Sequence, residues 1–368
     1  MTRAIGPGAI AGDLPPALRN RLEQVSRKLE RLMRRRPRGL VGPAGALTTL
    51  LGLATLQSRE AIGGRARRRW RRTLRRRAET RAELRDLQAR ARLISSARED
   101  LAAFFASDER LSFPPGPAAP EISIILVVWN QAHFVLKCLR ALLAEGPSFE
   151  LILVDNASGA ETQALLSRLD GVSLLRNPTN AGFLLACNQG AAMAHGRAML
   201  LVNSDAFVRP GALAAAVAAL ESEADIGAVG GRLILPDGRL QEAGCDVWAD
   251  GTTRGRGRGL PSEAPEAMVR RDVDYCSGAF LMIKAPLWRR LGGFDEVYAP
   301  AYYEEADLCL RLQAAGFRVV VEPKIAVDHF ELGSEIRTGD AARASERNRL
   351  IFAARHAEAL SRRRPPPA

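Results

Sequence analysis

The sequence predicts an α/β protein with a doubly wound, mostly parallel sheet, preceded by a basic and mainly helical N-terminal region. Short apolar runs alternate with stretches of helical periodicity from residue 122 onward, which is the pattern of repeated strand–helix–strand units. The charge is also divided unevenly: residues 1–115 hold 26 Lys and Arg against 11 Asp and Glu, and the rest of the chain holds 27 against 30. We therefore expect the two parts to form different structural units.

Length and composition fit a soluble globular protein with one large or two ordinary domains. The chain has 368 residues, of which 47% are apolar and 26% are charged, enough for a sizeable core. We place a basic helical region at 1–115, a Pro-rich linker at 116–120, the α/β domain at 121–335, and a C-terminal helix with a basic tail at 336–368. A helix cannot continue through the prolines around this linker.

Cysteine usage and the first residues indicate the compartment. The five cysteines are widely spaced and none belongs to a C-x-x-C pair, which excludes a zinc ribbon and a small disulfide scaffold and fits a reducing compartment. Met1–Pro16 contains no continuous apolar stretch followed by a small-residue cleavage site, so no secretory signal is visible. We therefore expect a cytoplasmic protein.

Two segments open the N-terminal region. Apolar residues recur at helical spacing between charged ones over 20–36, which predicts an amphipathic helix. Residues 39–58 are all uncharged, a length that would just cross a bilayer. Glycines and a proline interrupt this stretch, however, and arginines flank both of its ends. Three interpretations stay open: a membrane span, a segment at the membrane interface, and a packed or loose soluble stretch.

An arginine cluster and a long helix follow. Nine arginines fall within Arg65–Arg77, and the pattern predicts a helix from there to about Phe105. Residues 20–105 could bind an anionic membrane surface, form a solvated helical appendage, or bind nucleic-acid phosphates. Nucleic acid is the least favoured partner, because no recognised nucleic-acid motif accompanies the arginines. In the membrane interpretation the inserted side chains would be Trp70, Leu74, Phe104 and Phe105.

The α/β elements begin after the linker. Residues 122–128 form a β-rich apolar run of the kind buried on both faces of a parallel sheet, and a helical stretch to Leu143 follows. Connections as short as those that come next are typical of a doubly wound sheet, whose ligands bind at the carboxyl ends of the strands. The further elements are strand 151–154, helix 161–169, strand 172–175, helix 182–194 and strand 198–202.

Polar residues gather where these strands end. Carboxylate and amide groups can bind ribose and base, a Gly-containing loop lets backbone approach a ligand, and a carboxylate can hold a divalent cation on phosphates. We therefore predict a nucleotide-diphosphate site. A dinucleotide or P-loop site is disfavoured because neither G-x-G-x-x-G nor G-x-x-x-x-G-K-[ST] occurs. The polar segments are Trp129-Asn130, Asp155-Asn156-Ala157-Ser158, the loop 177–183, and Asn203-Ser204-Asp205.

An ordered set of short motifs resembles the family 2 glycosyltransferases, and specifically their bacterial rhamnosyltransferase-like branch with a GT-A fold. The resemblance covers about residues 120–335 and extends weakly to 347–350. Each string alone is weak, whereas eight in the family's order are specific. The matching strings are V-V-W-N, V-D-N-A-S, N-A-G-F, N-S-D, S-G-A-F, G-G-F-D-E, Y-E-E-A-D-L-C-L-R and V-D-H.

The resemblance implies transfer of a sugar from a nucleotide diphosphate to an acceptor hydroxyl, with inversion at the anomeric carbon. It implies that Asp155 contacts the nucleoside and that Asp205 and His329 hold a divalent cation, Mg²⁺ or Mn²⁺, which neutralises the leaving diphosphate. The other residues of the nucleotide-sugar site would be Asn130, Asn180, Gly182, Phe183 and Gly278.

The segment Glu304-Glu305-Ala306-Asp307 resembles the family's Glu-Asp-x-Asp, whose second acid is the general base. The resemblance makes Glu305 the base, with Glu304 and Asp307 orienting acceptor or base. Two features depart from the family: a single acid in Asn203-Ser204-Asp205, and Glu in place of the commoner Asp at the base position. A structural interpretation also stays open, because acids in the first turn of a helix stabilise it.

The expected protein is a bacterial glycosyltransferase of surface-polysaccharide synthesis, peripheral on the cytoplasmic face of the inner membrane. Its partners would be a nucleotide-sugar donor and a saccharide or lipid-linked acceptor. One alternative is a nucleic-acid-binding or scaffold protein with a degenerate transferase domain. Another is a nucleotidyltransferase, although no basic phosphate-binding signature follows Asn130.

Overall fold

The computed structural model describes residues 14–34, 64–114, 119–146, 149–331 and 338–366. The chain divides into two compact units, Met1–Ser96 and Ala97–Ala368, and each is treated separately. The predicted boundaries at 116–120 and 336 stay predictions.

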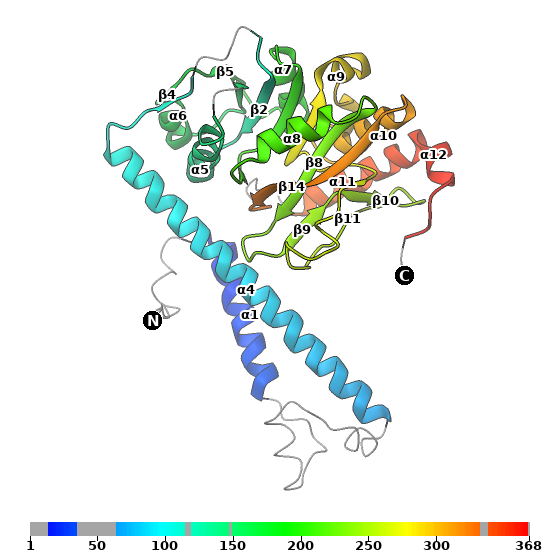
Figure 1. The fold of residues 1–368 in the computed structure, drawn as a ribbon. Helices are drawn as coiled ribbons and strands as arrows, with labels where there is room; N and C mark the ends of the chain where they lie inside the picture. Colours follow the sequence, from blue (N-terminus) through cyan, green and yellow to red (C-terminus); the bar gives the residue numbers. More distant parts are fainter. Residues whose placement is uncertain (1–13, 35–63, 115–118, 147–148, 332–337, 367–368) are drawn as a thin grey trace. The chain divides into compact units, whose positions relative to one another are not determined.

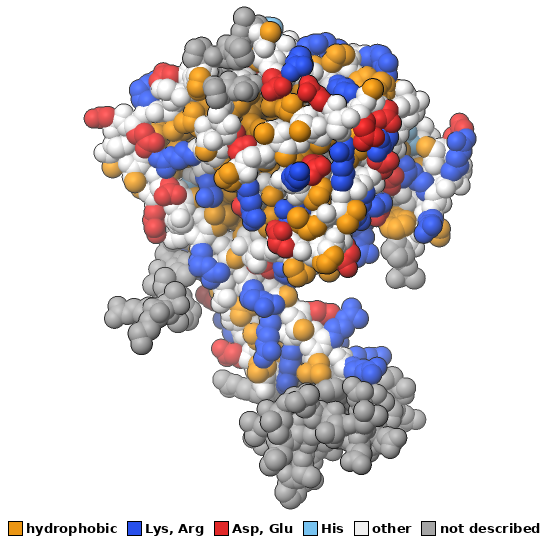
Figure 2. Space-filling model, viewed as in Figure 1, with side chains coloured by type: hydrophobic (Ala, Val, Ile, Leu, Met, Phe, Trp, Pro, Cys, Tyr) orange, Lys and Arg blue, Asp and Glu red, His pale blue; other side chains and the backbone are white. Residues whose placement is uncertain are grey.

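The first unit contains two helices that lie side by side, α1 (Pro16–Arg34) and the first part of α4 (Gly64–Ala106) (Figure 1). Arg77 Nε donates to the Leu32 carbonyl at 3.0 Å, and Arg21 pairs with Glu83. Both predicted helices are therefore present, and the helical N-terminal extension is confirmed. Figure 2 shows Lys and Arg side chains along their exposed surface. The segment 39–58 lies outside the described residues.

Within the described ranges, none of the helices combines the length and apolar character needed to cross a membrane. Leu74 on α4 is 41% exposed. Phe104, in contrast, is 1% exposed and packs in the second unit beneath the guanidinium groups of Arg140 and Arg168. Phe104 is therefore not available for the membrane insertion that the sequence suggested.

The second unit is built on a mixed sheet, and the four strands at one side of it are parallel. Its main path follows the order β12-β14-β8-β13-β6-β2-β3-β5, in which β13 runs antiparallel to both neighbours (Figure 1). The strands are β2 (Ile122–Val128), β3 (Phe149–Asp155), β5 (Ser173–Arg176), β6 (Ala198–Asn203), β7 (Ala206–Val208), β8 (Ile226–Ile234), β9 (Leu240–Ala243), β12 (Arg271–Asp272), β13 (Phe280–Lys284) and β14 (Arg318–His329).

Helices pack on the sheet, so that the predicted α/β architecture is confirmed. Adjacent residues Ile124 and Ile125 of β2 point to opposite faces and both are fully buried, as expected of a parallel strand covered on both faces. In Figure 1, α8 and α10 lie along β8 and β14. The helices are α5 (Ala132–Leu143), α6 (Ala160–Leu166), α7 (Phe183–Ala192), α8 (Ala212–Glu221), α9 (Ala285–Leu291), α10 (Glu304–Ala314), α11 (Thr338–Arg355) and α12 (Ala357–Ser361).

One predicted helix is shorter than expected. The helix predicted over 161–169 ends at Leu166, because β4 (Leu169–Asp170) pairs in parallel with β1 (Leu111–Ser112). Arg110 secures this pairing with two hydrogen bonds to the carboxylate of Asp170, of 2.6 and 2.7 Å. A two-residue strand has no periodicity of its own, so the sequence does not reveal it.

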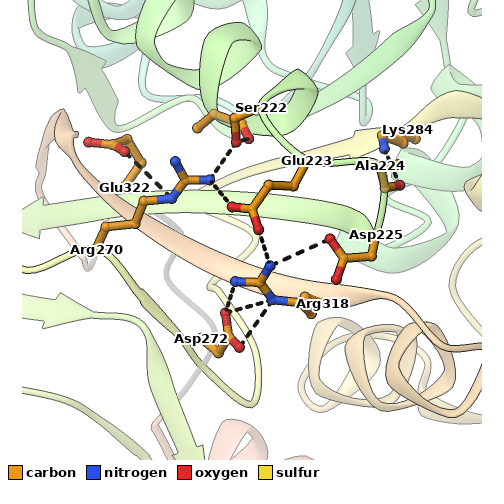
Figure 3. Close-up of polar contacts among 10 residues, drawn as sticks. Ser222, Glu223, Ala224, Asp225, Arg270, Asp272, Lys284, Arg318 and Glu322 are labelled. Atoms are coloured by element: carbon orange, nitrogen blue, oxygen red, sulfur yellow. Dashed lines mark hydrogen bonds and ion pairs between the residues drawn. The ribbon is translucent and has the colours of Figure 1, made fainter.

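An ion-pair network fixes the beginning of β14 (Figure 3). Arg318 contacts Glu223 at 2.7 Å and Asp272 of β12 at 2.9 Å. Arg270 donates to Ser222 and Glu223 in the turn after α8. The network joins the turn after α8, β12 and the first residue of β14. His329 is the last residue of β14, so the network helps to position the strand that carries this site residue.

Candidate active site

The turns after β2 and β3 are fixed to each other by the predicted nucleoside-binding residues. The Asp155 carboxylate accepts the backbone N–H of Ser158 at 2.9 Å, and the Ser158 hydroxyl accepts that of Asn130 at 2.9 Å. Asn130 Oδ1 in turn accepts the N–H of Gly159 at 2.8 Å. Asn130 has φ 58°, in the left-handed region that Asn tolerates better than most residues. Both predicted side chains therefore stabilise these turns.

Asn156, which the sequence placed in a polar segment of the predicted site without a role of its own, joins this turn to the loop before α7. Its Nδ2 donates to the Gly182 carbonyl at 3.1 Å, and its Oδ1 accepts from Asn177 Nδ2 at 2.8 Å. Within the loop, Asn180 Oδ1 accepts the N–H of Gly182 at 2.8 Å. The buried amide of Asn156 therefore shapes the loop that carries Asn180 and Gly182.

Two motifs far apart in the sequence meet at Phe183. A methyl group added at Gly278 would lie 3.2 Å from the Phe183 ring, so this glycine allows the close approach. Gly182 has φ 85°, and a Cβ there would lie 2.8 Å from Pro300. Gly182 therefore requires glycine, both for its positive φ and for its close approach to Pro300, whereas a side chain at Gly278 would need the Phe183 ring to shift. The N-A-G-F loop is thereby packed against the S-G-A-F segment and against the loop that precedes α10.

The acid pair Glu304–Glu305 opens α10; Glu304 is buried and Glu305 is partly buried. Burial raises the pKa of both carboxyls, and the neighbouring charge of Glu305 raises that of Glu304 further. The nearby backbone of Gly278 partly offsets the rise in the pKa of Glu305. One oxygen of each carboxyl, Oε2, has no hydrogen-bond partner among the residues that the structure describes. Buried unpartnered carboxyl oxygens are costly in a folded protein and are typical of ligand-binding sites.

Asp205 and His329 form the second predicted pair. His329 Nε2 lies 3.3 Å from Asp205 Oδ1, and β7 and β14 pair so that His329 is opposite Ala206. Burial disfavours the charged imidazole, but the Asp205 carboxylate outweighs it and the pKa of His329 is raised. The Nδ1 atom of His329 lies 2.8 Å from Gln241 Oε1, so Nδ1 carries a hydrogen and Nε2 faces Asp205.

The donor chemistry of this pair fits the divalent cation that the resemblance implies. A carboxylate oxygen and an imidazole nitrogen are both accepted by Mn²⁺, and the carboxylate by Mg²⁺. The hydrogen bond from Nδ1 to Gln241 would orient Nε2 as a ligand. No group of three His, Cys, Asp or Glu side chains suited to a metal occurs in the described parts of the chain, so a cation here would take further oxygens from a bound diphosphate.

Gln241 and Glu242 of β9 are site residues that sequence reasoning missed. Burial raises the pKa of Glu242 to about 7, and the charges of Glu305 and His329 both act on it. Cys245 Sγ donates to Glu242 Oε1 at 3.2 Å. The available signal was a polar Gln-Glu pair within the stretch 236–272, which matches none of the family strings.

Asp307 has contacts of a different kind. Its carboxylate accepts from Arg311 Nε at 2.6 Å, from Tyr298 OH at 3.2 Å, and lies 2.8 Å from His356 Nε2. Burial raises the pKa of Asp307, but these hydrogen bonds and charges outweigh it and the net shift is downward. The contacts favour a role in joining α10 to α12 over contact with an acceptor, and the predicted catalytic role stays untested.

The predicted residues thus fall into connected groups. Phe183, Gly278 and Glu305 are in contact, and Asp205 contacts His329. Glu242 lies close enough to both groups that the charges of Glu305 and His329 shift its pKa. Chemically, the arrangement offers a carboxyl with a raised pKa, a carboxylate–imidazole pair and a Gly-containing loop near the ends of parallel strands.

A family model and several known proteins match this chain. Residues 123–287 match the family model described as Glycosyl transferase family 2. An N-acetylglucosaminyl-diphospho-decaprenol L-rhamnosyltransferase of Mycobacterium tuberculosis is 27% identical over 244 residues, which cover 58% of this chain and 77% of that protein. The O-antigen biosynthesis protein RfbC of Myxococcus xanthus is 28% identical over 238 residues, 62% of this chain.

Some relatives are much longer than this chain. The matched region makes up 18% of RfbC and 25% of a Sinorhizobium fredii protein that is 29% identical. A solved structure, mannosyltransferase PcManGT from Pyrobaculum calidifontis in complex with GDP-Man and Mn²⁺, covers 78% of both chains at 18% identity, with a TM-score of 0.47. The family match, the ordered motifs and the α/β sheet therefore agree that residues 123–287 form a domain of the glycosyl transferase family 2 type.

Proposed function

We propose that this protein is an inverting glycosyltransferase that moves a sugar from a nucleotide-diphosphate donor to a hydroxyl of a glycan or lipid-linked acceptor. The observation that carries the proposal is the acid pair Glu304–Glu305, in which one buried oxygen of each carboxyl has no hydrogen-bond partner among the described residues. A purely structural acid at a helix N-terminus would be satisfied by the backbone or by solvent.

In the proposed reaction the acceptor oxygen attacks the anomeric carbon from the face opposite the diphosphate. The bond to the diphosphate oxygen breaks as the new glycosidic bond forms, which inverts the anomeric centre. Glu305 accepts the acceptor proton, and the backbone of Gly278 beside it favours the ionised carboxylate that can act as the base. Burial brings the pKa of Glu305 closer to neutral pH, where a base combines correct ionisation with proton affinity. Glu304 would orient the acceptor or the base.

Asp155, Asn130, Asn180 and Gly182 would shape the nucleoside side of the site. Asp205 and His329 would hold Mg²⁺ or Mn²⁺, and the bound cation would supply positive charge to the leaving diphosphate. Each of these roles follows from the family resemblance together with the contacts described above.

The relatives suggest the biological setting. Two matching proteins are named for O-antigen biosynthesis and for rhamnosyl transfer to a decaprenol-linked sugar. We therefore place this chain in bacterial surface-polysaccharide synthesis, with a hexosyl or rhamnosyl donor. Exposed arginines of α4 support peripheral attachment to the anionic cytoplasmic face of the inner membrane.

A donor panel tests the function. Purified protein is titrated with UDP-glucose, UDP-N-acetylglucosamine, GDP-mannose and dTDP-rhamnose, with and without Mn²⁺, and binding is followed by thermal shift. We expect Mn²⁺-dependent stabilisation by one of them, and release of its nucleoside diphosphate when acceptor is added. Steeply salt-dependent RNA binding without binding of any nucleotide sugar would favour the scaffold alternative instead.

Substitution of the proposed base tests the mechanism. Glu305→Gln removes the proton acceptor and keeps the side-chain shape, so transfer should fall by about 10²–10⁴-fold while donor affinity is retained. Asp205→Ala should abolish the Mn²⁺ dependence of donor binding. Glu266→Gln changes the charge by the same amount at an exposed position and serves as the control. Transfer at the normal rate by Glu305→Gln would refute the mechanism.

A further inference from the structure

The loop 297–302, which leads into the acid pair, has all of its carbonyl groups bonded. Two neighbouring side chains of α11 bind five of them. Arg347 donates to the carbonyls of Val297 and Ala299 at 3.1 and 3.0 Å. The fully buried Asn348 donates its Nδ2 hydrogens to the carbonyls of Tyr298, Ala301 and Tyr302, at 2.7, 2.9 and 2.9 Å.

The sixth carbonyl, that of Pro300, accepts the backbone N–H of Leu184 at 3.3 Å. Pro300 is also the residue against which Gly182 packs. The loop therefore lies between the loop before α7 and the α11 residues Arg347 and Asn348.

The backbone that these contacts hold is strained. Tyr302 and Tyr303 have φ 78° and 74°, a region that bulky residues rarely adopt. Such conformations persist only where the surroundings enforce them. Tyr303 directly precedes Glu304, and its ring packs 5.2 Å from that of Phe352 on α11. The strain thus lies immediately before the acid pair.

From these contacts we propose that Arg347 and Asn348 are positioning residues for the proposed base: they hold the loop 297–302 in a strained conformation that aims Glu305 at the acceptor. The inference rests on the proposed function. Arg347 Nη1 also donates to Asn348 Oδ1 at 3.3 Å, which sets the amide orientation so that its N–H groups face the carbonyls. The isosteric Asn348→Asp would replace these donors by a carboxylate and repel the same carbonyls.

The test compares Asn348→Ala and Asn348→Asp with Leu350→Ala. Leu350 lies on the same helix and is 56% exposed, so its substitution should leave activity unchanged. Displacement of a catalytic group by about 1 Å can lower turnover by about 10²-fold. We therefore expect both Asn348 variants to lower kcat by about 100-fold. Affinity for UDP, GDP and dTDP should stay within about twofold, because Asn156 holds the donor loop separately.

Deuterium uptake of the peptide 297–305 gives a readout that does not depend on activity. It should be faster in both Asn348 variants and unchanged in Leu350→Ala. Arg347→Ala removes two of the five carbonyl contacts and should give a smaller effect in both measurements, which keeps the test valid if the Asn348 variants do not fold.

Unchanged kcat and unchanged uptake in the Asn348 variants would overturn the proposal. A fall in kcat matched by an equal loss of nucleotide affinity would also overturn it, because it would indicate general disruption. If the wild-type protein transfers sugar from none of the panel donors, the proposed function fails. The uptake measurement then decides separately whether the two residues fix the loop.

Discussion

Three carboxyl groups near the candidate active site ionise less readily than usual because they are removed from water. They are Glu242, Glu304 and Glu305. For each of them burial is the largest cause of a raised pKa. Two of the three also have an oxygen without a hydrogen-bond partner in the described part of the chain. The same burial that suits a carboxyl to proton transfer should therefore lower the stability of the protein at neutral pH.

The pKa of Glu242 predicts in which direction the stability of the protein changes with pH, and over which pH range. The value rises from 4.5 to about 7 on folding, so between these pH values the folded chain holds a proton that the unfolded chain releases. The free energy of unfolding contributed by this group is greatest below pH 4.5, falls as the pH rises to about 7, and is constant above it. The total change is at most about 3 kcal/mol.

Urea denaturation of the wild type and of Glu242→Gln at pH 5 and pH 8 checks the prediction. The neutral amide does not titrate, so the variant should gain stability relative to the wild type on going from pH 5 to pH 8. Both proteins should still lose some stability, because Glu304 and Glu305 titrate in the same direction. The exposed Glu266→Gln is the control. Equal changes in wild type and Glu242→Gln would mean that Glu242 is not protonated in the folded state.

The contacts of Asn348 and Asp307 could not be predicted from the sequence. The string around Asn348 was only a weak extension of the family resemblance, and nothing in the sequence shows that its amide meets three carbonyls some 50 positions earlier. Asp307 occupied a catalytic position in its motif, yet its carboxylate contacts Arg311, Tyr298 and His356. Such contacts depend on how the C-terminal helices pack, which local pattern does not encode.

At the level of elements, the network around Arg318 predicts a salt-dependent effect. Arg318→Ala removes contacts to Glu223, Asp225 and Asp272 (Figure 3) and leaves three carboxylates near one another. We expect the melting temperature to fall by about 2 °C at 0.05 M NaCl. The difference should shrink at 0.5 M NaCl, where exposed charges are screened.

Thermal melts at the two salt concentrations, with Arg254→Ala as the control, measure this effect. Arg254 is an exposed arginine on β11 (Thr253–Gly255). A loss of stability that is the same at both salt concentrations would show that Arg318 acts through packing of its aliphatic part instead of through its charge.

The four predicted strands are present, and three of them, at 122–128, 151–154 and 198–202, are apolar runs that are almost entirely buried, where continuous burial leaves little choice of residue type. The strands after residue 203 were not predicted, and they include the fully buried β8. The short antiparallel pair β10 (Cys245–Val247) and β11 and the strand β4 were not predicted either. Their pairing is set by contacts with distant segments, and two or three residues carry no usable period.

For the whole molecule, the division of charge matters more than its total. The net charge is +12, and the basic excess lies in residues 1–115. On α4, Arg71, Arg72 and Arg76 are exposed. A transferase with a lipid-linked acceptor gains from a basic surface, because attraction to anionic lipid raises its concentration at the bilayer.

Vesicle binding tests this interpretation on the full chain. We expect the wild type to bind vesicles of phosphatidylglycerol and phosphatidylcholine at 0.1 M NaCl and to be released at 0.5 M, since screening weakens the attraction. Each arginine near an anionic surface contributes about 1 kcal/mol. The triple variant R71Q/R72Q/R76Q should therefore bind about 100-fold more weakly, as measured by co-sedimentation.

A matched triple variant distinguishes a specific surface from general charge. R176Q/R254Q/R364Q removes the same charge from exposed positions of the second unit and should bind the vesicles like the wild type. An equal loss in both triple variants would mean that total charge, and not the arginines of α4, causes the attraction. Failure of the wild type to bind anionic vesicles at 0.1 M NaCl would leave α4 as a solvated appendage, and the acceptor would then have to reach the active site without help from the N-terminal region.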